Sequence, residues 1–220
     1  MKLFTIPNII TLLNLLCGML GILYVFNEQL EMASYMILVA LVLDFLDGFL
    51  ARKLNSYSDI GKQLDSLADM VSFGVLPSFM LYYLIPMDGW VKFLTFLPAM
   101  ASALRLAKFN IDERQGTVFY GIPTPANAMV VASFPFIALE NIGEDLIIYL
   151  SLYAIAISFM MLLDKPMIAF KFKDFSWSNN KPRYSVIAVS VLLLVILKLA
   201  ALPFILLAYM AGSFYFKEDI

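Results

Sequence analysis

The sequence predicts an all-α, multi-pass membrane protein, and two observations lead to that fold class. First, 62% of the 220 residues are hydrophobic and 15% are charged, with a mean hydropathy of +0.85. Soluble domains are only about half apolar, so most of the surface of this chain is expected to face lipid. Second, glycine, proline and charged residues interrupt the apolar stretches at intervals of about 20 residues, the length that a helix needs to cross a bilayer.

These interruptions divide the chain into eight predicted transmembrane helices within a single domain of residues 1–220. The fifth helix is short, and the last two, in residues 184–216, are joined by a tight Leu202-Pro203 connection. The predicted ranges are Ile9–Phe26, Met32–Lys53, Asp59–Leu84, Trp90–Phe109, Pro125–Leu139, Leu146–Leu163, Tyr184–Leu197 and Leu202–Phe216.

The basic residues indicate how the helices are oriented. On this topology all but two of the 15 Lys and Arg residues fall on one side of the membrane, the exceptions being Lys92 and Lys198. Cytoplasmic loops carry the excess of positive charge in membrane proteins. We therefore expect a cell-membrane protein with both termini in the cytoplasm.

Charge and residue usage exclude several classes of function. The formal net charge of -2 gives no electrostatic reason to expect nucleic acid as a partner. The chain has no histidine and one cysteine, Cys17, which excludes Ser-His and Cys-His catalysis, an intrachain disulfide and a thiolate metal cluster. Carboxylates are therefore the expected metal ligands and proton acceptors.

Four aspartates lie in stretches that are otherwise apolar enough to span the membrane. They occur in DFLDGFLARKLNSYSDIGKQLDSLAD, as Asp44, Asp47, Asp65 and Asp69. An aspartate near the centre of a membrane helix costs about 2.5–3.5 kcal/mol, so four together need compensating charge or water. Their helical spacing places each pair on one face, at matching distances in sequence from a predicted turn near Tyr57. We expect the four carboxylates to meet in a cavity that opens to the cytoplasm.

Several acidic oxygens without His or Cys favour hard divalent cations such as Mg²⁺ or Mn²⁺. Two such ions about 3.5–4 Å apart stabilise both the attacking and the leaving oxygen in a phosphoryl displacement. Arg52, close to the predicted cavity mouth, would add a planar donor for phosphate oxygens. The alternative from another functional class is the cation site of a coupled transporter, because ionisable groups in membranes are not always catalytic.

Small residues on the same helix faces have two interpretations. Gly48, Ala51 and Gly61 leave room for a ligand to approach the backbone. Close packing between helices requires small residues equally. The spacing alone leaves both interpretations open.

The segment as a whole is identified as the signature of a known family. The pattern D-x2-D-G-x2-A-R-x8-G-x3-D-x3-D over residues 44–69 resembles that of the CDP-alcohol phosphatidyltransferases at every fixed position. The resemblance implies transfer of a phosphatidyl group from a CDP-linked lipid to an alcohol, with release of CMP. It implies that the four aspartates ligate two metal ions and that Asp69 also deprotonates the alcohol. Family members further suggest a homodimer.

The resemblance also implies a binding site for the CDP-linked lipid. Two of its residues have simpler interpretations, since Thr11 with Pro7 is suited to starting a helix and Ser58 is suited to capping one. The residues assigned to this site are Asn8, Thr11, Gly48, Ala51, Arg52, Ser58 and Gly61.

Three stretches outside the signature resemble the phosphatidylserine synthase branch of the family and therefore imply L-serine as the acceptor. They are IPNIITLLN at residues 6–14, VSFGVLP at 71–77, and ALRLAKFN at 103–110 followed by GIPTP at 121–125. The residues assigned to the acceptor are Asn14, Arg105, Lys108 and Asn110. Arg105 is the main candidate, because serine carries a carboxylate and arginine binds carboxylates bidentately.

These acceptor residues have structural alternatives as well. Asn14 is suited to a hydrogen bond between helices, and Arg105 and Lys108 to anchoring at the cytoplasmic membrane surface. Glycerol 3-phosphate or an inositol phosphate remains an alternative acceptor. The sequence does not distinguish a diacylglycerol donor from an archaeal ether-lipid donor.

Overall fold

The computed structural model describes residues 3–85, 89–112, 119–137, 145–167 and 177–215. Within these ranges the chain is helical, as predicted, apart from one short antiparallel pair in which Phe119 lies opposite Met167. The elements are α1 (Ile6–Phe26), α2 (Leu30–Lys53), α3 (Asp59–Asp69), π-helical η1 (Met70–Val75), α4 (Leu76–Leu84), 3₁₀-helical η2 (Trp90–Phe96), α5 (Leu97–Ile111), β1 (Phe119–Tyr120), α6 (Thr124–Ser133), 3₁₀-helical η4 (Phe134–Phe136), α7 (Leu146–Leu162), β2 (Pro166–Met167), α8 (Trp177–Leu197), 3₁₀-helical η6 (Lys198–Ala201) and α9 (Leu202–Tyr215).

The described residues contain five helical stretches long and apolar enough to cross a membrane, compared with eight predicted helices. The first four agree with the prediction, and α7 lies at the predicted sixth position but is shorter than a full span. The predicted fifth helix is helical only as α6 and η4, and its end lies outside the described residues. The ranges of the five stretches are Ile6–Phe26, Leu30–Lys53, Asp59–Leu84, Trp90–Ile111 and Arg183–Ser213.

The fifth stretch, 31 residues long, contains a turn. Lys198 has φ 53°, a left-handed backbone conformation that ends a helix, and α8 and α9 contact each other on either side of it. The two helices therefore form a hairpin, at the place where the sequence predicts two helices joined tightly.

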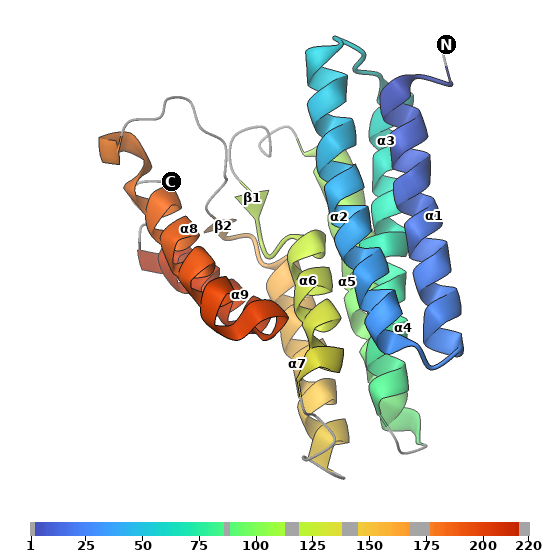
Figure 1. The fold of residues 1–220 in the computed structure, drawn as a ribbon, viewed down its shortest axis with the longest axis vertical. Helices are drawn as coiled ribbons and strands as arrows, with labels where there is room; N and C mark the ends of the chain where they lie inside the picture. Colours follow the sequence, from blue (N-terminus) through green and yellow to red (C-terminus); the bar gives the residue numbers. More distant parts are fainter. Residues whose placement is uncertain (1–2, 86–88, 113–118, 138–144, 168–176, 216–220) are drawn as a thin grey trace.

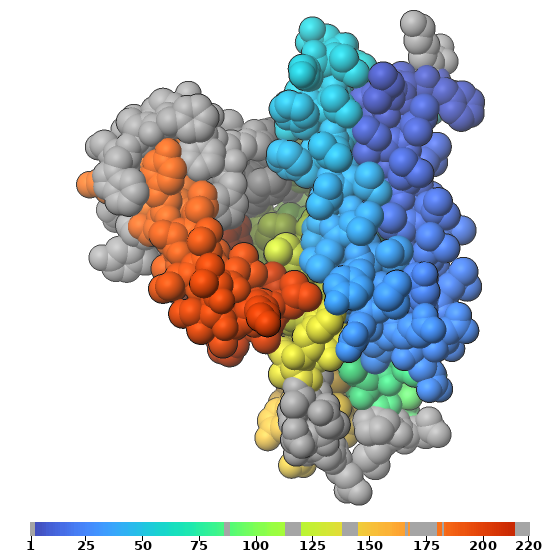
Figure 2. Space-filling model, viewed as in Figure 1, coloured from blue at the N-terminus to red at the C-terminus, as the bar shows by residue number. Residues whose placement is uncertain are grey.

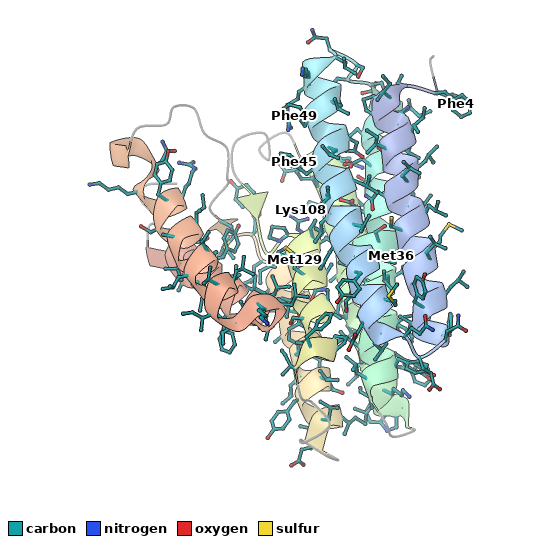
Figure 3. All side chains as sticks on the ribbon, in the orientation of Figure 1. Phe4, Met36, Phe45, Phe49, Lys108 and Met129 are labelled. Atoms are coloured by element: carbon teal, nitrogen blue, oxygen red, sulfur yellow. The ribbon has the colours of Figure 1, made fainter. Side chains whose placement is uncertain are left out.

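The helices α1 to α7 lie side by side as a bundle, and the hairpin of α8 and α9 lies against one flank (Figure 1). Its contacts with the bundle come from α9, which touches α6 and β2, and from η6, which touches α6 and η4. In the view of Figure 2 the surface is hollowed between α8 and α2. Large apolar side chains cover the outer faces, including Phe4, Phe45 and Phe49 (Figure 3), as expected for lipid contact.

The bundle is packed most tightly where α1 meets η1 and α4. A Cβ atom on Gly18 would lie 2.6 Å from Ser72 Oγ and 2.9 Å from Ser72 Cα. One turn later, a Cβ on Gly21 would lie 2.3 Å from the terminal Cδ2 of Leu76. Small residues allow helix backbones to approach this closely in membranes. As a result α1 packs directly on the segment that follows Asp69.

A second close approach fixes the loop that precedes α6. Gly121 has φ 68°, and a Cβ there would lie 2.4 Å from the carbonyl oxygen of Met161. Its N–H donates to the carbonyl of Lys165 at 3.1 Å, and the N–H of Ile122 donates to that of Met160 at 3.2 Å. The loop is therefore held against the end of α7, and this places Thr124 at the start of α6.

We expect Gly18→Ala to destabilise the protein by about 1–3 kcal/mol, the usual cost of overpacking. The added methyl would meet Ser72 backbone, which cannot move aside independently of η1. Gly21→Ala is the matched control, because it gains the same helix propensity and meets the side chain of Leu76, which can adjust without moving the backbone. Thermal unfolding in detergent micelles measures both. An equal or larger loss for Gly21→Ala would contradict the proposed contact.

Candidate active site

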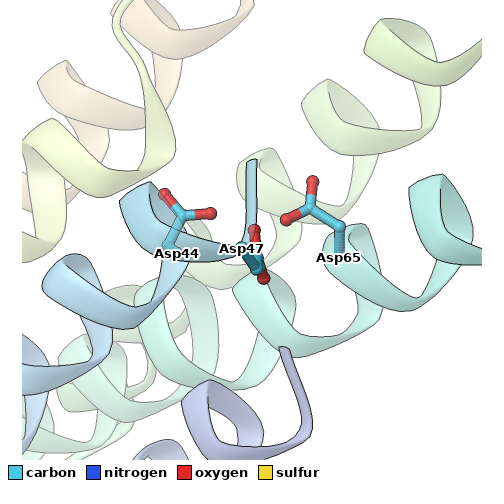
Figure 4. Close-up of side chains that lie close together, drawn as sticks. All are labelled: Asp44, Asp47 and Asp65. Carbon is cyan, nitrogen blue, oxygen red and sulfur yellow. The ribbon is translucent and has the colours of Figure 1, made fainter. Parts of the chain in front are cut away.

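Three of the four aspartates form one compact group. Asp44 and Asp47 come from the C-terminal half of α2 and Asp65 from α3, and Figure 4 shows the three side chains facing one another. One carboxylate oxygen of each lies within 4.8 Å of those of the other two. Asp47 is only 5% exposed, and Asp44 and Asp65 are half-buried. An all-oxygen group of this kind can hold a hard metal ion.

Asp69 lies beside this group but is held separately. It is one turn beyond Asp65 at the end of α3 and is 7% exposed. Its carboxylate is close enough to interact electrostatically with all three others. The side-chain amide of Asn14 donates to its Oδ1 at 3.3 Å, so the interpretation of Asn14 as an interhelical contact is confirmed. The fourth carboxylate thus has a neighbour from α1 that holds it in position.

The helix changes form directly after Asp69. Residues Met70–Val75 are π-helical, a form that occurs mostly as single turns and often at functional sites. The hydroxyl of Ser72 in this turn donates to the backbone carbonyl of Asn14 at 2.9 Å. Sequence reasoning missed Ser72 and the π-helix. A usable signal was Pro77, which has no N–H to donate to the carbonyl of Phe73 one turn earlier.

Thr11 does more than start a helix. Its Oγ1 lies 2.5 Å from Oδ2 of Asp47 and 3.1 Å from the carbonyl oxygen of Pro7. The hydroxyl has one hydrogen, and the shorter distance is typical of donation to a carboxylate. Thr11 therefore satisfies the most buried member of the three-carboxylate group.

The two glycines of the signature have different surroundings. A Cβ on Gly61 would lie 3.1 Å from Ser58 Oγ and 3.2 Å from Asn8 Oδ1, so Gly61 serves close packing. On Gly48 the one described neighbour within 4 Å would be Arg52 Nη1, at 3.9 Å. The space at Gly48 agrees with the ligand interpretation.

The remaining residues of the predicted donor site lie at one end of the bundle. Ser58 Oγ accepts a hydrogen bond from the N–H of Gly61 at 3.1 Å, which confirms its role as a helix cap. Asn8 is buried and donates from its side chain to the carbonyl of Leu3 at 2.8 Å. Arg52, in the last turn of α2, is exposed, and Ala51 is half-buried.

Arg105 is buried, which is unusual for an arginine near a membrane surface. Its side chain is 7% exposed, Nη1 lies 3.5 Å from Thr124 Oγ1, and Nε has no hydrogen-bond partner among the described residues. Its charge interacts electrostatically with that of Asp69. A surface anchor would be exposed, whereas a buried and incompletely bonded guanidinium is costly unless a ligand supplies an acceptor.

Lys108 and Asn110 have partners elsewhere in the described structure. Lys108 Nζ lies 3.2 Å from Oδ1 of Asp164, in a pair whose side chains are 44% and 56% exposed. The amide nitrogen of Asn110 donates to Ser66 Oγ at 2.9 Å and to Gln63 Oε1 at 3.2 Å. The two residues therefore tie the end of α5 to α3 and to the segment after α7, and the sequence patterns did not reveal the roles of Ser66 and Gln63.

The whole region from α1 to α7 corresponds to a known family. Residues 4–163 match the sequence model of the CDP-alcohol phosphatidyltransferases. The chain belongs to this family. It is therefore an integral membrane enzyme of the phosphatidyltransferase class, and α8 and α9 lie outside the matched region.

Similar proteins with assigned names include three from different microorganisms. A CDP-diacylglycerol–serine O-phosphatidyltransferase of Bacillus subtilis is 41% identical over 60% of this chain and 76% of its own length. A protein of the same name from Methanocaldococcus jannaschii is 36% identical over 74% of this chain and 73% of its own length. An archaetidylserine synthase of Methanothermobacter thermautotrophicus is 34% identical over 59% of this chain and 57% of its own length.

We expect Thr11→Val to destabilise the metal-free protein by about 1–3 kcal/mol, because Asp47 stays buried while losing its hydroxyl donor. Thermal unfolding in detergent with a chelator present would measure the loss. Ser34→Ala is the control, since the described partner of that buried hydroxyl is the Leu30 carbonyl of its own helix, at 3.1 Å. Equal losses in the two variants would show that the link to Asp47 contributes nothing specific.

Proposed function

We propose that this enzyme transfers the phosphatidyl group of a CDP-linked lipid to the hydroxyl of L-serine, giving phosphatidylserine and CMP. The observation that carries the proposal is the buried Arg105 guanidinium with an unpaired Nε, within electrostatic reach of Asp69. Serine carries its hydroxyl and its carboxylate on neighbouring carbons, so one molecule can contact both Asp69 and Arg105. The names of the similar proteins support the same acceptor.

The aspartates would bind Mg²⁺ or Mn²⁺, with two ions per site. Three convergent carboxylates and the adjacent Asp69 agree with the donor set that these hard cations prefer. When bound, such ions would neutralise the donor pyrophosphate and the departing CMP. Thr11 would hold Asp47 in its ligating orientation, as groups that hydrogen-bond metal ligands do in other sites.

In the proposed reaction Asp69 accepts the proton of the serine hydroxyl. The hydroxyl oxygen attacks the phosphorus on the lipid side of the pyrophosphate, and the bond from that phosphorus to the CMP oxygen breaks. Asn14 orients the Asp69 carboxylate through its hydrogen bond, and Arg105 binds the serine carboxylate. Lys108 and Asn110 would frame the acceptor site by fixing the end of α5.

The donor would bind where α1, α2 and α3 meet. The free space at Gly48 and the exposed Arg52 support a nucleotide and pyrophosphate site at that end of α2. Asn8, Thr11, Ala51, Ser58 and Gly61 line or support the same end.

We place this end at the cytoplasmic surface, because Arg52, Lys53 and Lys62 lie beside it. We also propose that the chain forms a single domain of eight membrane helices with both termini in the cytoplasm. We further propose that it forms a homodimer.

The purified protein should release CMP from CDP-diacylglycerol with serine and Mn²⁺ or Mg²⁺, and much less with glycerol 3-phosphate or inositol phosphate. Asp69→Asn should abolish this release because the amide cannot accept the proton, while the fold is largely preserved and the three-carboxylate group keeps some binding of Mn²⁺. Chromatographic assay of CMP, with electron paramagnetic resonance of Mn²⁺, tests both points. Turnover by the Asn variant would rule out Asp69 as the base, and preference for another alcohol would rule out serine.

Arg105→Ala should raise the KM for serine by roughly 10- to 100-fold, the loss expected for a hydrogen-bonded charge pair, and leave the KM for the donor lipid within about twofold. Arg105→Lys should be intermediate because it keeps the charge but not the planar fork. Lys108→Ala should raise the KM for serine much less, since that side chain is exposed, pairs with Asp164 and would act only through the position of α5. Equal weakening of serine and donor use in Arg105→Ala would make Arg105 a structural residue.

A further inference from the structure

The C-terminal hairpin, which lies outside the family-matched residues 4–163, brings a buried tyrosine to the acceptor side of the site. Tyr209 on α9 is 7% exposed. It belongs to an apolar cluster with Ala101, Ile122 and Met161 from α5, the preceding loop of α6, and α7. This cluster joins the hairpin to the bundle.

Two of these neighbours place Tyr209 next to the proposed serine site. Ala101 lies one helical turn before Arg105, on the same face of α5. Ile122 lies in the loop leading to Thr124, whose hydroxyl contacts Arg105. In agreement, the Arg105 charge interacts electrostatically with the Tyr209 phenol as well as with Asp69.

The Arg105 side chain needs such a neighbour. An arginine has several rotatable bonds, and ordering a long side chain costs up to about 2 kcal/mol in entropy. Among the described residues its one hydrogen bond is the 3.5 Å contact with Thr124. The phenol of Tyr209 is held in turn by a side-chain hydrogen bond with Ser213, which is 1% exposed. A phenol that is itself hydrogen-bonded therefore lies within electrostatic reach of the guanidinium.

We infer that Tyr209 is a positioning residue, which orients the Arg105 guanidinium so that it can receive the acceptor carboxylate. The inference rests on the proposed function in taking Arg105 as the acceptor contact. It assigns part of the acceptor site to α9, a helix that the family region does not include.

The test is steady-state kinetics of Tyr209→Phe, which removes the hydroxyl and keeps the ring. The KM for the acceptor should rise about tenfold, with kcat and the KM for CDP-diacylglycerol changed by less than about twofold. In an Arg105→Ala background the same substitution should add no further loss, because the group that it positions is gone. Ser213→Ala should shift the acceptor KM in the same direction to a smaller extent.

Tyr153→Phe is the matched control. Tyr153 is another tyrosine of the bundle interior, on α7, whose hydroxyl donates to Asn127 Oδ1 at 2.7 Å. This variant should lower thermal stability without a selective change in acceptor KM. If Tyr209→Phe behaves in the same way, or adds its full effect to Arg105→Ala, the positioning role is overturned.

The assay uses whichever alcohol the wild-type enzyme accepts among serine, glycerol 3-phosphate and inositol phosphate. Failure of serine in wild type would refute the proposed function while still allowing the Tyr209 comparison with the acceptor that works. Success with serine but an unchanged acceptor KM in Tyr209→Phe would refute only the role of Tyr209.

Discussion

The structure depends on keeping four carboxylates inside an apolar helix bundle. Like charges at this separation repel strongly in a medium of low dielectric, and the bundle offers little water to offset the cost. The described residues meet this demand with hydroxyl and amide donors from α1, at Thr11 and Asn14, and not with a lysine or arginine paired directly to the three-carboxylate group. Among the described residues, no basic side chain therefore competes with a divalent cation for these carboxylate oxygens.

The same demand explains the packing around α1. An asparagine reaches a carboxylate on a neighbouring helix only if the backbones are close, and Gly18 and Gly21 allow α1 to approach the segment that follows Asp69. In the π-helical turn after Asp69, Ser72 donates a hydrogen bond to the Asn14 carbonyl. Asn14 of α1 therefore contacts Asp69 through its side chain and Ser72 through its backbone. The first helix, which contributes none of the four aspartates, is therefore required for their geometry.

Sequence reasoning succeeded where a short-range rule sufficed. Helical spacing predicted that Asp44, Asp47 and Asp65 meet, and composition predicted a membrane bundle. It was less successful where tertiary contacts decide the outcome. Gly48 and Gly61 look equivalent in the signature, yet one borders open space and the other packs against Asn8. Arg105 and Lys108 are likewise both basic residues near the end of one helix, and only the fold shows that one is buried beside Asp69 while the other pairs with Asp164.

In the proposed mechanism, two groups of helices have different functions at the site. The proposed metal and donor side belongs to α1, α2 and α3, where Thr11 and Asn14 of α1 hydrogen-bond to Asp47 and Asp69. The proposed acceptor side belongs to α5, α6 and α9, where Thr124 and Tyr209 lie near the Arg105 guanidinium, whose Nε has no hydrogen-bond partner among the described residues. Because α9 lies outside the family-matched residues 4–163, part of the proposed acceptor site belongs to a helix that the family region does not include.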